Sequence, residues 1–123
     1  MNVLIIEDDA PTAAAIADTV RALGHAVERV SKATEVLAEL DRSDFDLIVL
    51  DIFLPDVRGD RLIPRVRRIK PEIAIVTMTG YNSRELERKI RKLGILYYII
   101  KPVCTKDLSD LFKHVSHRMN KTP

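Results

Sequence analysis

Short, largely apolar runs alternate along the chain with longer segments in which apolar residues recur every three or four positions. The runs lie at residues 2–6, 26–30, 47–50, 73–78 and 97–100. Continuous apolar runs of this length are typical of parallel strands that are buried on both faces. The intervening segments predict amphipathic helices. The alternation therefore predicts an α/β fold, an open five-stranded parallel sheet with helices on both faces.

The residues at the ends of the helical segments predict where these helices begin. Ser31, Ser83 and Thr105 are placed to cap the second, fourth and fifth helices, because their hydroxyls can accept hydrogen bonds from free backbone N–H groups. Pro64 falls inside the third helical pattern, so we expect it to delay or kink the start of that helix. The last helix should give way to a short polar tail at residues 120–123.

Length and composition indicate one globular domain over residues 1–123, with residues 2–119 as its folded core. The 123 residues are 46% hydrophobic and 31% charged, which suits a soluble protein. No apolar run approaches the roughly 20 residues that a membrane-spanning helix needs. The one cysteine, Cys104, excludes an internal disulfide and a cysteine-based zinc site. We expect a cytoplasmic protein.

Charge is distributed unevenly between the two halves of the chain. Residues 1–57 carry 4 Lys/Arg and 12 Asp/Glu, whereas residues 58–123 carry 16 and 6. A basic half can indicate nucleic-acid contact. The basic runs contain no interleaved aromatic residues for base stacking, however. Solvated basic helix faces beside an acidic site are therefore the favoured interpretation.

The central apolar run ends on a carboxylate. Asp51 follows residues 47–50 directly, at the carboxyl end of a strand, where open α/β sheets place their ligands. Pro55 should stop the strand, and Gly59 should allow the chain to turn towards the next helix. Asp51 alone would also suit a helix cap or a loop, so its meaning depends on the other residues at this edge of the sheet.

Polar residues of matching chemistry follow three other strands. Glu7 and Asp8 come after the first strand, Thr79 ends the fourth and Lys101 follows the fifth. All of these positions lie at one edge of a parallel sheet. Clustered carboxylates without His or Cys favour magnesium, manganese or calcium. A lysine and a hydroxyl on the same edge can hold phosphoryl oxygens, so the set suits a phosphoryl group carried on a carboxylate.

Four motifs together resemble those of the CheY-like response regulator receiver domains of two-component signalling. They are Ile5-Ile6-Glu7-Asp8-Asp9, Asp51-Ile52-Phe53-Leu54-Pro55 with Gly59, Thr79-Gly80, and Tyr98-Ile99-Ile100-Lys101-Pro102. The resemblance covers residues 2 to about 119. It implies a flavodoxin-like, doubly wound (βα)5 fold with strand order 2-1-3-4-5.

The resemblance also implies a role for each site residue. Asp51 would be the phosphoacceptor, assisted by Lys101 and Thr79, and Thr79 and Tyr98 would form the switch. The implied magnesium ligands are Glu7 (through water), Asp8, Asp51 and the backbone carbonyl of Phe53, and Mn²⁺ is an alternative ion. Pro55 and Gly59 would be structural, and the bond before Pro102 would be cis.

The implied function is a signalling switch rather than an enzyme, since the domain would catalyse only its own phosphorylation and slow dephosphorylation. The phosphoryl donor would be a histidine kinase or a histidine phosphotransfer protein. The surface of the fourth helix, fifth strand and fifth helix would act on an effector or output domain, or form a homodimer. The resemblance places Phe53 and Tyr81 beside the approach of water to Asp51, and their bulk predicts slow hydrolysis. The alternative is a weak role of the Tyr81 hydroxyl in positioning that water.

The chain departs from the family pattern around the fifth strand. Ile95 stands where alanine is usual, Leu96 and Tyr97 follow where polar residues are common, and Val103-Cys104 replaces an aromatic and polar pair. These changes make the expected output surface unusually apolar. Such a patch is typical of a partner or dimer contact. The alternative is that Leu96 packs beneath the fifth strand.

Other classes of protein fit the sequence less well. A haloacid-dehalogenase-type phosphatase needs an aspartate where Phe53 stands. A flavodoxin needs a hydroxyl- and glycine-rich loop where residues 7–9 are acidic, and a Rossmann dehydrogenase needs a GxGxxG motif that is absent. No helix-turn-helix is free of the predicted sheet, so nucleic-acid contact would need another domain.

Overall fold

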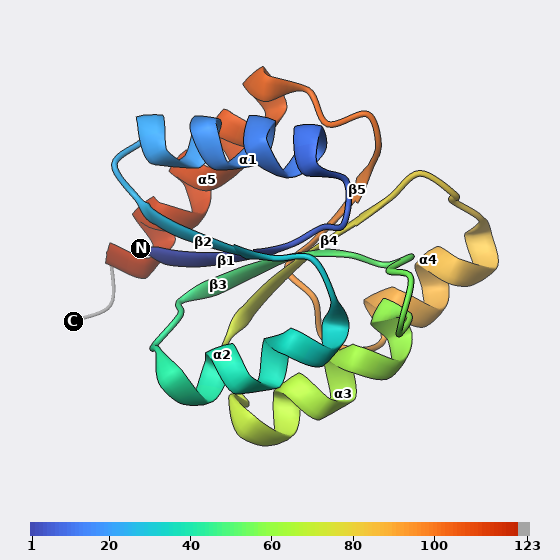
Figure 1. Ribbon diagram of the computed structural model, residues 1–123. Helices are drawn as coiled ribbons and strands as arrows, with labels where there is room; N and C mark the ends of the chain where they lie inside the picture. Colours follow the sequence, from blue (N-terminus) through green and yellow to red (C-terminus); the bar gives the residue numbers. More distant parts are fainter. Residues whose placement is uncertain (121–123) are drawn as a thin grey trace.

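The computed structural model describes residues 1–120 and contains one five-stranded parallel sheet (Figure 1). The strands are β1 (Asn2–Ile6), β2 (Ala26–Val30), β3 (Leu47–Asp51), β4 (Ala74–Thr79) and β5 (Tyr97–Ile100). Their order in the sheet is β2-β1-β3-β4-β5, and every neighbouring pair is parallel. The predicted fold class and strand order are confirmed.

Helices cover both faces of the sheet (Figure 1). Helices α1 (Ala10–Ala22) and α5 (Thr105–Asn120) lie on one face, and α2 (Val36–Arg42), α3 (Gly59–Ile69) and α4 (Arg84–Arg91) lie on the other. A short 3₁₀ turn, η1 (Ala33–Glu35), precedes α2. Within residues 1–120, none of the helices combines the length and apolar character that crossing a membrane requires.

The core has two layers because alternate residues of each strand point to opposite faces. Val3 and Ile5 of β1 pack with the α1 and α5 side, around the fully buried Phe112. Leu4 and Ile6 pack with the layer beneath α2, α3 and α4. These four side chains have no exposed surface, and only Asn2 of β1 is exposed. Burial on both faces explains why the sequence of this strand is a continuous apolar run rather than an alternating one.

The start of the second helix is capped from a distant part of the chain. The carboxylate of Asp56 accepts hydrogen bonds from the N–H groups of Ala33 and Thr34, each at 3.0 Å. The predicted cap at Ser31 is wrong, because its hydroxyl instead donates to the Glu35 carboxylate at 3.3 Å. Sequence spacing could not identify Asp56, which lies in the loop after β3 and reaches this helix only through the fold.

Other predicted helix boundaries had mixed outcomes. The Ser83 hydroxyl accepts from the Leu86 N–H at 3.1 Å, which confirms this cap. The predicted cap at Thr105 is wrong, because Thr105 is already the first residue of α5. The Leu108 N–H donates to the carbonyl of Cys104 at 3.0 Å. Helix α3 begins at Gly59 and contains Pro64, so Pro64 does not delay its start. Asn120, the first residue of the predicted tail, is still helical, and residues 121–123 lie outside the described residues.

Gly59 is required for a close approach rather than for an unusual backbone angle. Positive φ values among the described glycines occur only at Gly24 and Gly94, which follow helices α1 and α4. A Cβ atom added to Gly59 would lie 3.1 Å from the Cα of Ile52. The Gly59 N–H donates to the Ile52 carbonyl at 2.7 Å. The glycine thus lets the start of α3 pack against the residue that follows Asp51.

Replacing Asp56 by alanine should lower the free energy of unfolding by about 1 kcal/mol at pH 7, the usual cost of losing a helix cap. Burial would raise the pKa of this carboxyl, but the N–H groups of Thr34 and Ala33 outweigh that effect and lower it. The stabilisation is therefore present above the ordinary pKa of 3.8 and is lost as the pH falls through the lowered value.

Urea unfolding from pH 7 down to about pH 3 would measure this difference between wild type and variant. The exposed Asp41→Ala on α2 is the matched control and should change the free energy by less than about 0.5 kcal/mol. A difference for Asp56→Ala that stays constant over the whole pH range would contradict the assignment.

Candidate functional site

Three carboxylates meet at the carboxyl edge of the sheet. Glu7 and Asp8 follow β1 directly, and Asp51 is the last residue of the adjacent strand β3. One carboxylate oxygen from each lies within 4.8 Å of the other two. Glu7 has no exposed surface and Asp51 is 5% exposed, whereas Asp8 is exposed. The cluster therefore has a buried floor and one ligand on the solvent side.

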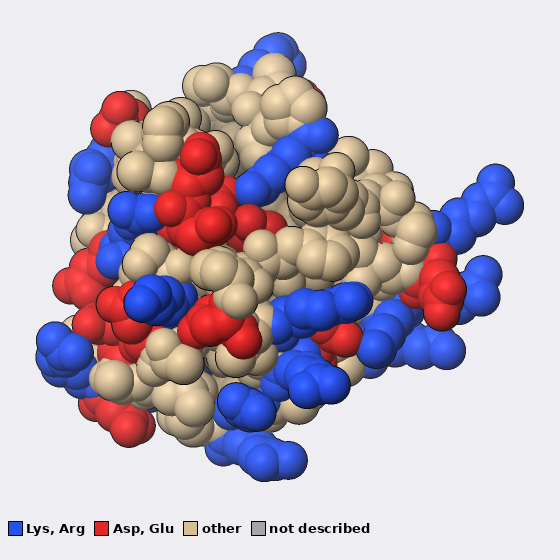
Figure 2. Space-filling model, turned by 45° about the vertical axis from the view of Figure 1, so that its right-hand side comes forward, with Lys and Arg blue, Asp and Glu red and all other residues tan. Residues whose placement is uncertain are grey.

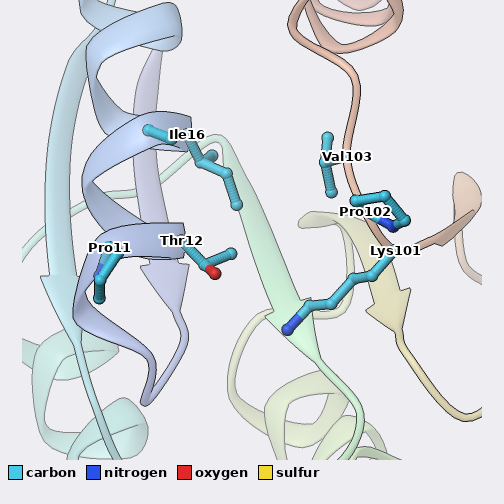
Figure 3. A pocket seen from close by; sticks show the side chains of 7 residues that line it. Pro11, Thr12, Ile16, Lys101, Pro102 and Val103 are labelled. Carbon is cyan, nitrogen blue, oxygen red and sulfur yellow. The ribbon is translucent and has the colours of Figure 1, made fainter.

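Lys101 supplies the positive charge of this cluster. Its side chain extends from the residue after β5 across the edge of the sheet (Figure 3). The ammonium group donates to Oε1 of Glu7 and, at 3.2 Å, to Oδ2 of Asp51. Its backbone N–H donates to the Thr79 carbonyl at 2.8 Å, and this bond fixes the backbone from which the side chain extends. The Lys101–Pro102 peptide bond is cis.

Burial and the neighbouring charges shift the pKa values of this ion pair. Burial raises the pKa of the Glu7 carboxyl to about 7, despite the opposing hydrogen bond from Lys101, and the nearby Asp51 acts in the same direction as burial. Burial disfavours the charged form of Lys101, but hydrogen bonds and charges from Glu7 and Asp51 outweigh it and raise its pKa. Lys101 therefore remains a cation at neutral pH.

The carboxylates open into a cavity of about 450 Å³. Its lining residues are Glu7, Asp8, Asp9, Asp51, Phe53, Gly80, Tyr81 and Lys101. Figure 2 turns this edge of the molecule forward and shows acidic side chains gathered beside basic ones. A second hollow of about 560 Å³ lies between the start of α1 and residues 101–103, so that Lys101 borders both (Figure 3). The carboxylate edge is thus accessible to a ligand or a partner.

Phe53 and Tyr81 form an aromatic pair beside Asp51. The ring of Tyr81 meets that of Phe53 edge to face, with 5.4 Å between centroids. The Phe53 N–H donates to Oδ1 of Asp51 at 3.2 Å, which holds this carboxylate in place. Phe53 is half-buried and Tyr81 is 75% exposed. The pair therefore borders the cavity on the side of the loop between β4 and α4.

Both switch candidates are hydrogen-bonded to the loop between β4 and α4. Thr79 is buried at the end of β4, and its Oγ1 accepts from the Tyr81 N–H at 3.0 Å. The Tyr98 hydroxyl donates to Oδ1 of Asn82 at 2.6 Å, and the Arg91 guanidinium lies 5.6 Å from the centroid of its ring. Tyr98 is thus half-buried and tied to the β4–α4 loop and to α4, contacts that the sequence did not predict.

Arg29 on the edge strand β2 is a further residue that sequence reasoning missed. Its Nη2 and Nε donate to the Glu7 carbonyl at 2.8 and 3.1 Å, and Nη2 also donates to the Asp8 carbonyl at 3.1 Å. These bonds fix the loop that carries the acidic pair. A single arginine in an edge strand has no sequence signal that distinguishes it from a solvated side chain.

Comparison with known proteins agrees with this geometry. The family model of the response regulator receiver domain matches residues 3–113 of the chain. The chain belongs to the response regulator receiver family. The solved structure of a CheY-like receiver domain protein from Methanospirillum hungatei JF-1 superposes with a TM-score of 0.90 at 30% identity, over 98% of this chain and 96% of that one.

Curated relatives of this receiver domain are longer response regulators. The DNA-binding transcriptional regulator NtrC of Azospirillum brasilense is 29% identical over 119 residues, which are 97% of this chain and 24% of the relative. The response regulator protein FleR of Pseudomonas aeruginosa is 30% identical over 110 residues, which are 89% and 23%. The chain thus spans about a quarter of the length of these two relatives.

Membership of the family establishes the general character of the domain. Receiver domains of two-component systems are phosphorylation-dependent signalling switches, not metabolic enzymes. The family binds Mg²⁺ in an acidic pocket, and the cluster of Glu7, Asp8 and Asp51 offers the hard oxygen ligands that such an ion prefers.

Replacing Lys101 by methionine should lower the free energy of unfolding by about 1–3 kcal/mol at pH 7, because it leaves the buried Glu7 and Asp51 without their counter-charge. The matched control is Lys106→Met, which removes an exposed lysine paired with Asp110 on α5 and should cost less than about 1 kcal/mol. Urea unfolding in metal-free buffer measures both variants, and equal losses would contradict a special role for Lys101.

Proposed function

We propose that Asp51 accepts a phosphoryl group from the phosphohistidine of a histidine kinase or a histidine phosphotransfer protein. The observation that carries the proposal is the position of Asp51 at the floor of the open cavity, 3.2 Å from the Lys101 ammonium and beside two further carboxylates. The Asp51 oxygen forms the new O–P bond as the P–N bond breaks, and the imidazole nitrogen keeps the electron pair.

The residues around Asp51 fit a magnesium ion, with Mn²⁺ as the alternative. Asp8, Asp51 and the Phe53 carbonyl would hold the ion directly, and Glu7, already bonded to Lys101, would act through water. When bound, the ion supplies positive charge that offsets the negative charge of the phosphoryl oxygens. The mixture of one exposed and two buried carboxylates supports this assignment, because Mg²⁺ usually keeps several of its waters.

Lys101 and Thr79 would hold the transferred group. The Lys101 ammonium already contacts Asp51 and can move its hydrogen bond to a phosphoryl oxygen. Thr79 lies one residue beyond Met78, the partner of Asp51 in the β3–β4 register. Its hydroxyl accepts from the Tyr81 N–H and keeps its own proton to donate to a phosphoryl oxygen.

The output would follow from movement of Thr79. A shift of Thr79 towards the phosphoryl group would move the β4–α4 loop through the bond to Tyr81. Tyr98 contacts the same loop through Asn82. The affected surface comprises α4, β5 and α5, and it would act on an effector or an output domain or form a homodimer. We place this signalling in the cytoplasm and assign no direct nucleic-acid contact to the receiver domain itself.

The same residues predict a long-lived phosphorylated state. Phe53 and Tyr81 border the cavity in which Asp51 lies, and neither carries an acid or amide to orient water. Their bulk would instead obstruct the approach of water to Asp51. Weak positioning of that water by the Tyr81 hydroxyl is the competing alternative. The domain would therefore catalyse its own phosphorylation and only slowly its dephosphorylation.

We expect Asp51 to be the sole phosphorylation site. Mass spectrometry of protein incubated with acetyl phosphate and Mg²⁺ should show one added phosphoryl group in wild type and none in Asp51→Asn. Asp9→Asn is the matched control: it keeps a side chain that can cap α1 and should retain the full yield. Full modification of Asp51→Asn would refute the proposed function.

Asp8→Asn should weaken Mg²⁺ binding by more than about tenfold, since even residues that merely surround metal ligands commonly change affinity by that factor. The same change relieves repulsion among the carboxylates, so the metal-free variant should be no less stable than wild type. Calorimetric titration with Mg²⁺ measures the Kd of each protein, and Asp9→Asn is the control. Equal values of Kd for wild type and Asp8→Asn would exclude Asp8 as a ligand.

A further inference from the structure

Phe53 and Tyr81 form a wall between two cavities. Both residues line the cavity that contains Asp51, and both also line a neighbouring cavity of about 400 Å³. The second cavity lies between the β3–α3 loop and α4, and its other lining residues are Arg58, Ser83, Glu85, Leu86 and Lys89. The position of this aromatic wall therefore depends on what packs against its outer side, away from Asp51.

Arg58 packs against that outer side. Its guanidinium carbon lies 5.1 Å from the centroid of the Phe53 ring, within the range of a cation–π contact. The backbones of Phe53 and Arg58 form an isolated antiparallel bridge, which places the two side chains opposite each other. Phe53 in turn meets Tyr81 edge to face. The three side chains thus form a continuous row of contacts from the β3–α3 loop to the β4–α4 loop.

The direction of the Arg58 side chain is fixed from the opposite side. Its Nε donates to Oδ1 of Asp60 at 3.2 Å, and the other oxygen of Asp60 lies 2.8 Å from the Lys89 ammonium on α4. The Asp60 side chain is only 7% exposed, so this carboxylate is partly shielded from water. The Arg58 side chain is 50% exposed, and its two contacts, with Asp60 and with the Phe53 ring, fix its direction.

Arg58 occupies a position where helix stability favours a different residue. It is the N-cap of α3 and makes no capping hydrogen bond through its side chain. Asn, Asp and Ser are preferred at this position, and a cation is unfavourable at the positive end of the helix dipole. Such a departure from local preference is expected where a residue serves a site rather than its own helix.

We propose that Arg58 is a positioning residue that holds Phe53 against Tyr81 and thereby restricts the access of water to phosphorylated Asp51. The proposal deepens the proposed function, because it rests on phosphorylation of Asp51. Arg58 touches neither the carboxylate nor the phosphoryl group and acts through the two rings. Hydrolysis adds a water oxygen to phosphorus and breaks the bond to the Asp51 oxygen, so closing the path of that water lengthens the lifetime.

The decisive variant is Arg58→Asn, compared with Arg61→Asn, which removes the same charge from an exposed position on α3. After transfer from acetyl phosphate and removal of the donor, loss of phosphoprotein in Mg²⁺ should be about two- to fivefold faster in Arg58→Asn, the factor expected from one cation–π contact. Arg61→Asn should decay at the wild-type rate. Arg58→Lys keeps a cation over the ring and should restore part of the lifetime.

Stability separates positioning from a merely structural role. Because asparagine is a good N-cap, Arg58→Asn should unfold at the same or a higher urea concentration than wild type, while its phosphate is lost faster. In a Phe53→Leu background the Arg58→Asn change should no longer alter the decay. Decay of Arg58→Asn at the rate of Arg61→Asn, or an undiminished effect in the Phe53→Leu background, would overturn the proposal.

Two further readouts distinguish failure of this inference from failure of the proposed function. The phosphoryl content at the start of each decay reports whether Asp51 is modified at all, independently of the rate. In the unphosphorylated protein, NMR shifts of the Phe53 and Tyr81 ring protons should change in Arg58→Asn and stay fixed in Arg61→Asn. Unchanged ring shifts would refute the positioning of the rings by Arg58 whether or not the protein is phosphorylated.

Discussion

The site depends on one ion pair that crosses the edge of the sheet, between the Lys101 ammonium and the buried carboxylates of Glu7 and Asp51. Carboxylates this close repel one another, and burial deprives them of water. The counter-charge comes from Lys101, the residue after β5, and β5 is separated from β3 by β4. Asp51 is paired with Met78 and Met78 with Ile99, so Lys101 lies two residues beyond the level of Asp51, and its side chain spans the end of β4. Register and strand order are therefore requirements of the electrostatics as well as of the fold.

The sequence predicted the sheet and its functional edge because each depends on a local pattern. A strand buried on both faces must be apolar throughout, and parallel strands bring their carboxyl ends together, so the cluster of Glu7, Asp51 and Lys101 could be predicted without coordinates. The strand order came from the family resemblance, since apolar runs alone do not say which strands are neighbours.

Features that depend on distant partners could not be predicted in this way. Ser31 has the chemistry of a helix cap, but Asp56 supplies the cap from a loop 22 and 23 residues beyond the two N–H groups that it binds. Gly59 was interpreted as a turn residue, whereas its backbone is ordinary and its lack of a Cβ serves the contact with Ile52. The Arg29 guanidinium holds the acidic loop through hydrogen bonds to the carbonyls of Glu7 and Asp8. In each case the contacting residue is brought close by tertiary packing, and no pattern of spacing in the sequence identifies it.

The loop that follows Asp51 connects these observations. Its Asp56 caps η1, which leads into α2, its Arg58 packs on Phe53, and Asp60 just beyond it binds Lys89 of α4. The backbone is pinned to the end of β3 by the Gly59–Ile52 hydrogen bond. The same short segment thus contacts the 3₁₀ turn before α2, the helix α4 and the aromatic wall. Charged residues in this loop, which look like ordinary surface positions in the sequence, therefore connect the segment after Asp51 to η1, to Phe53 and to α4.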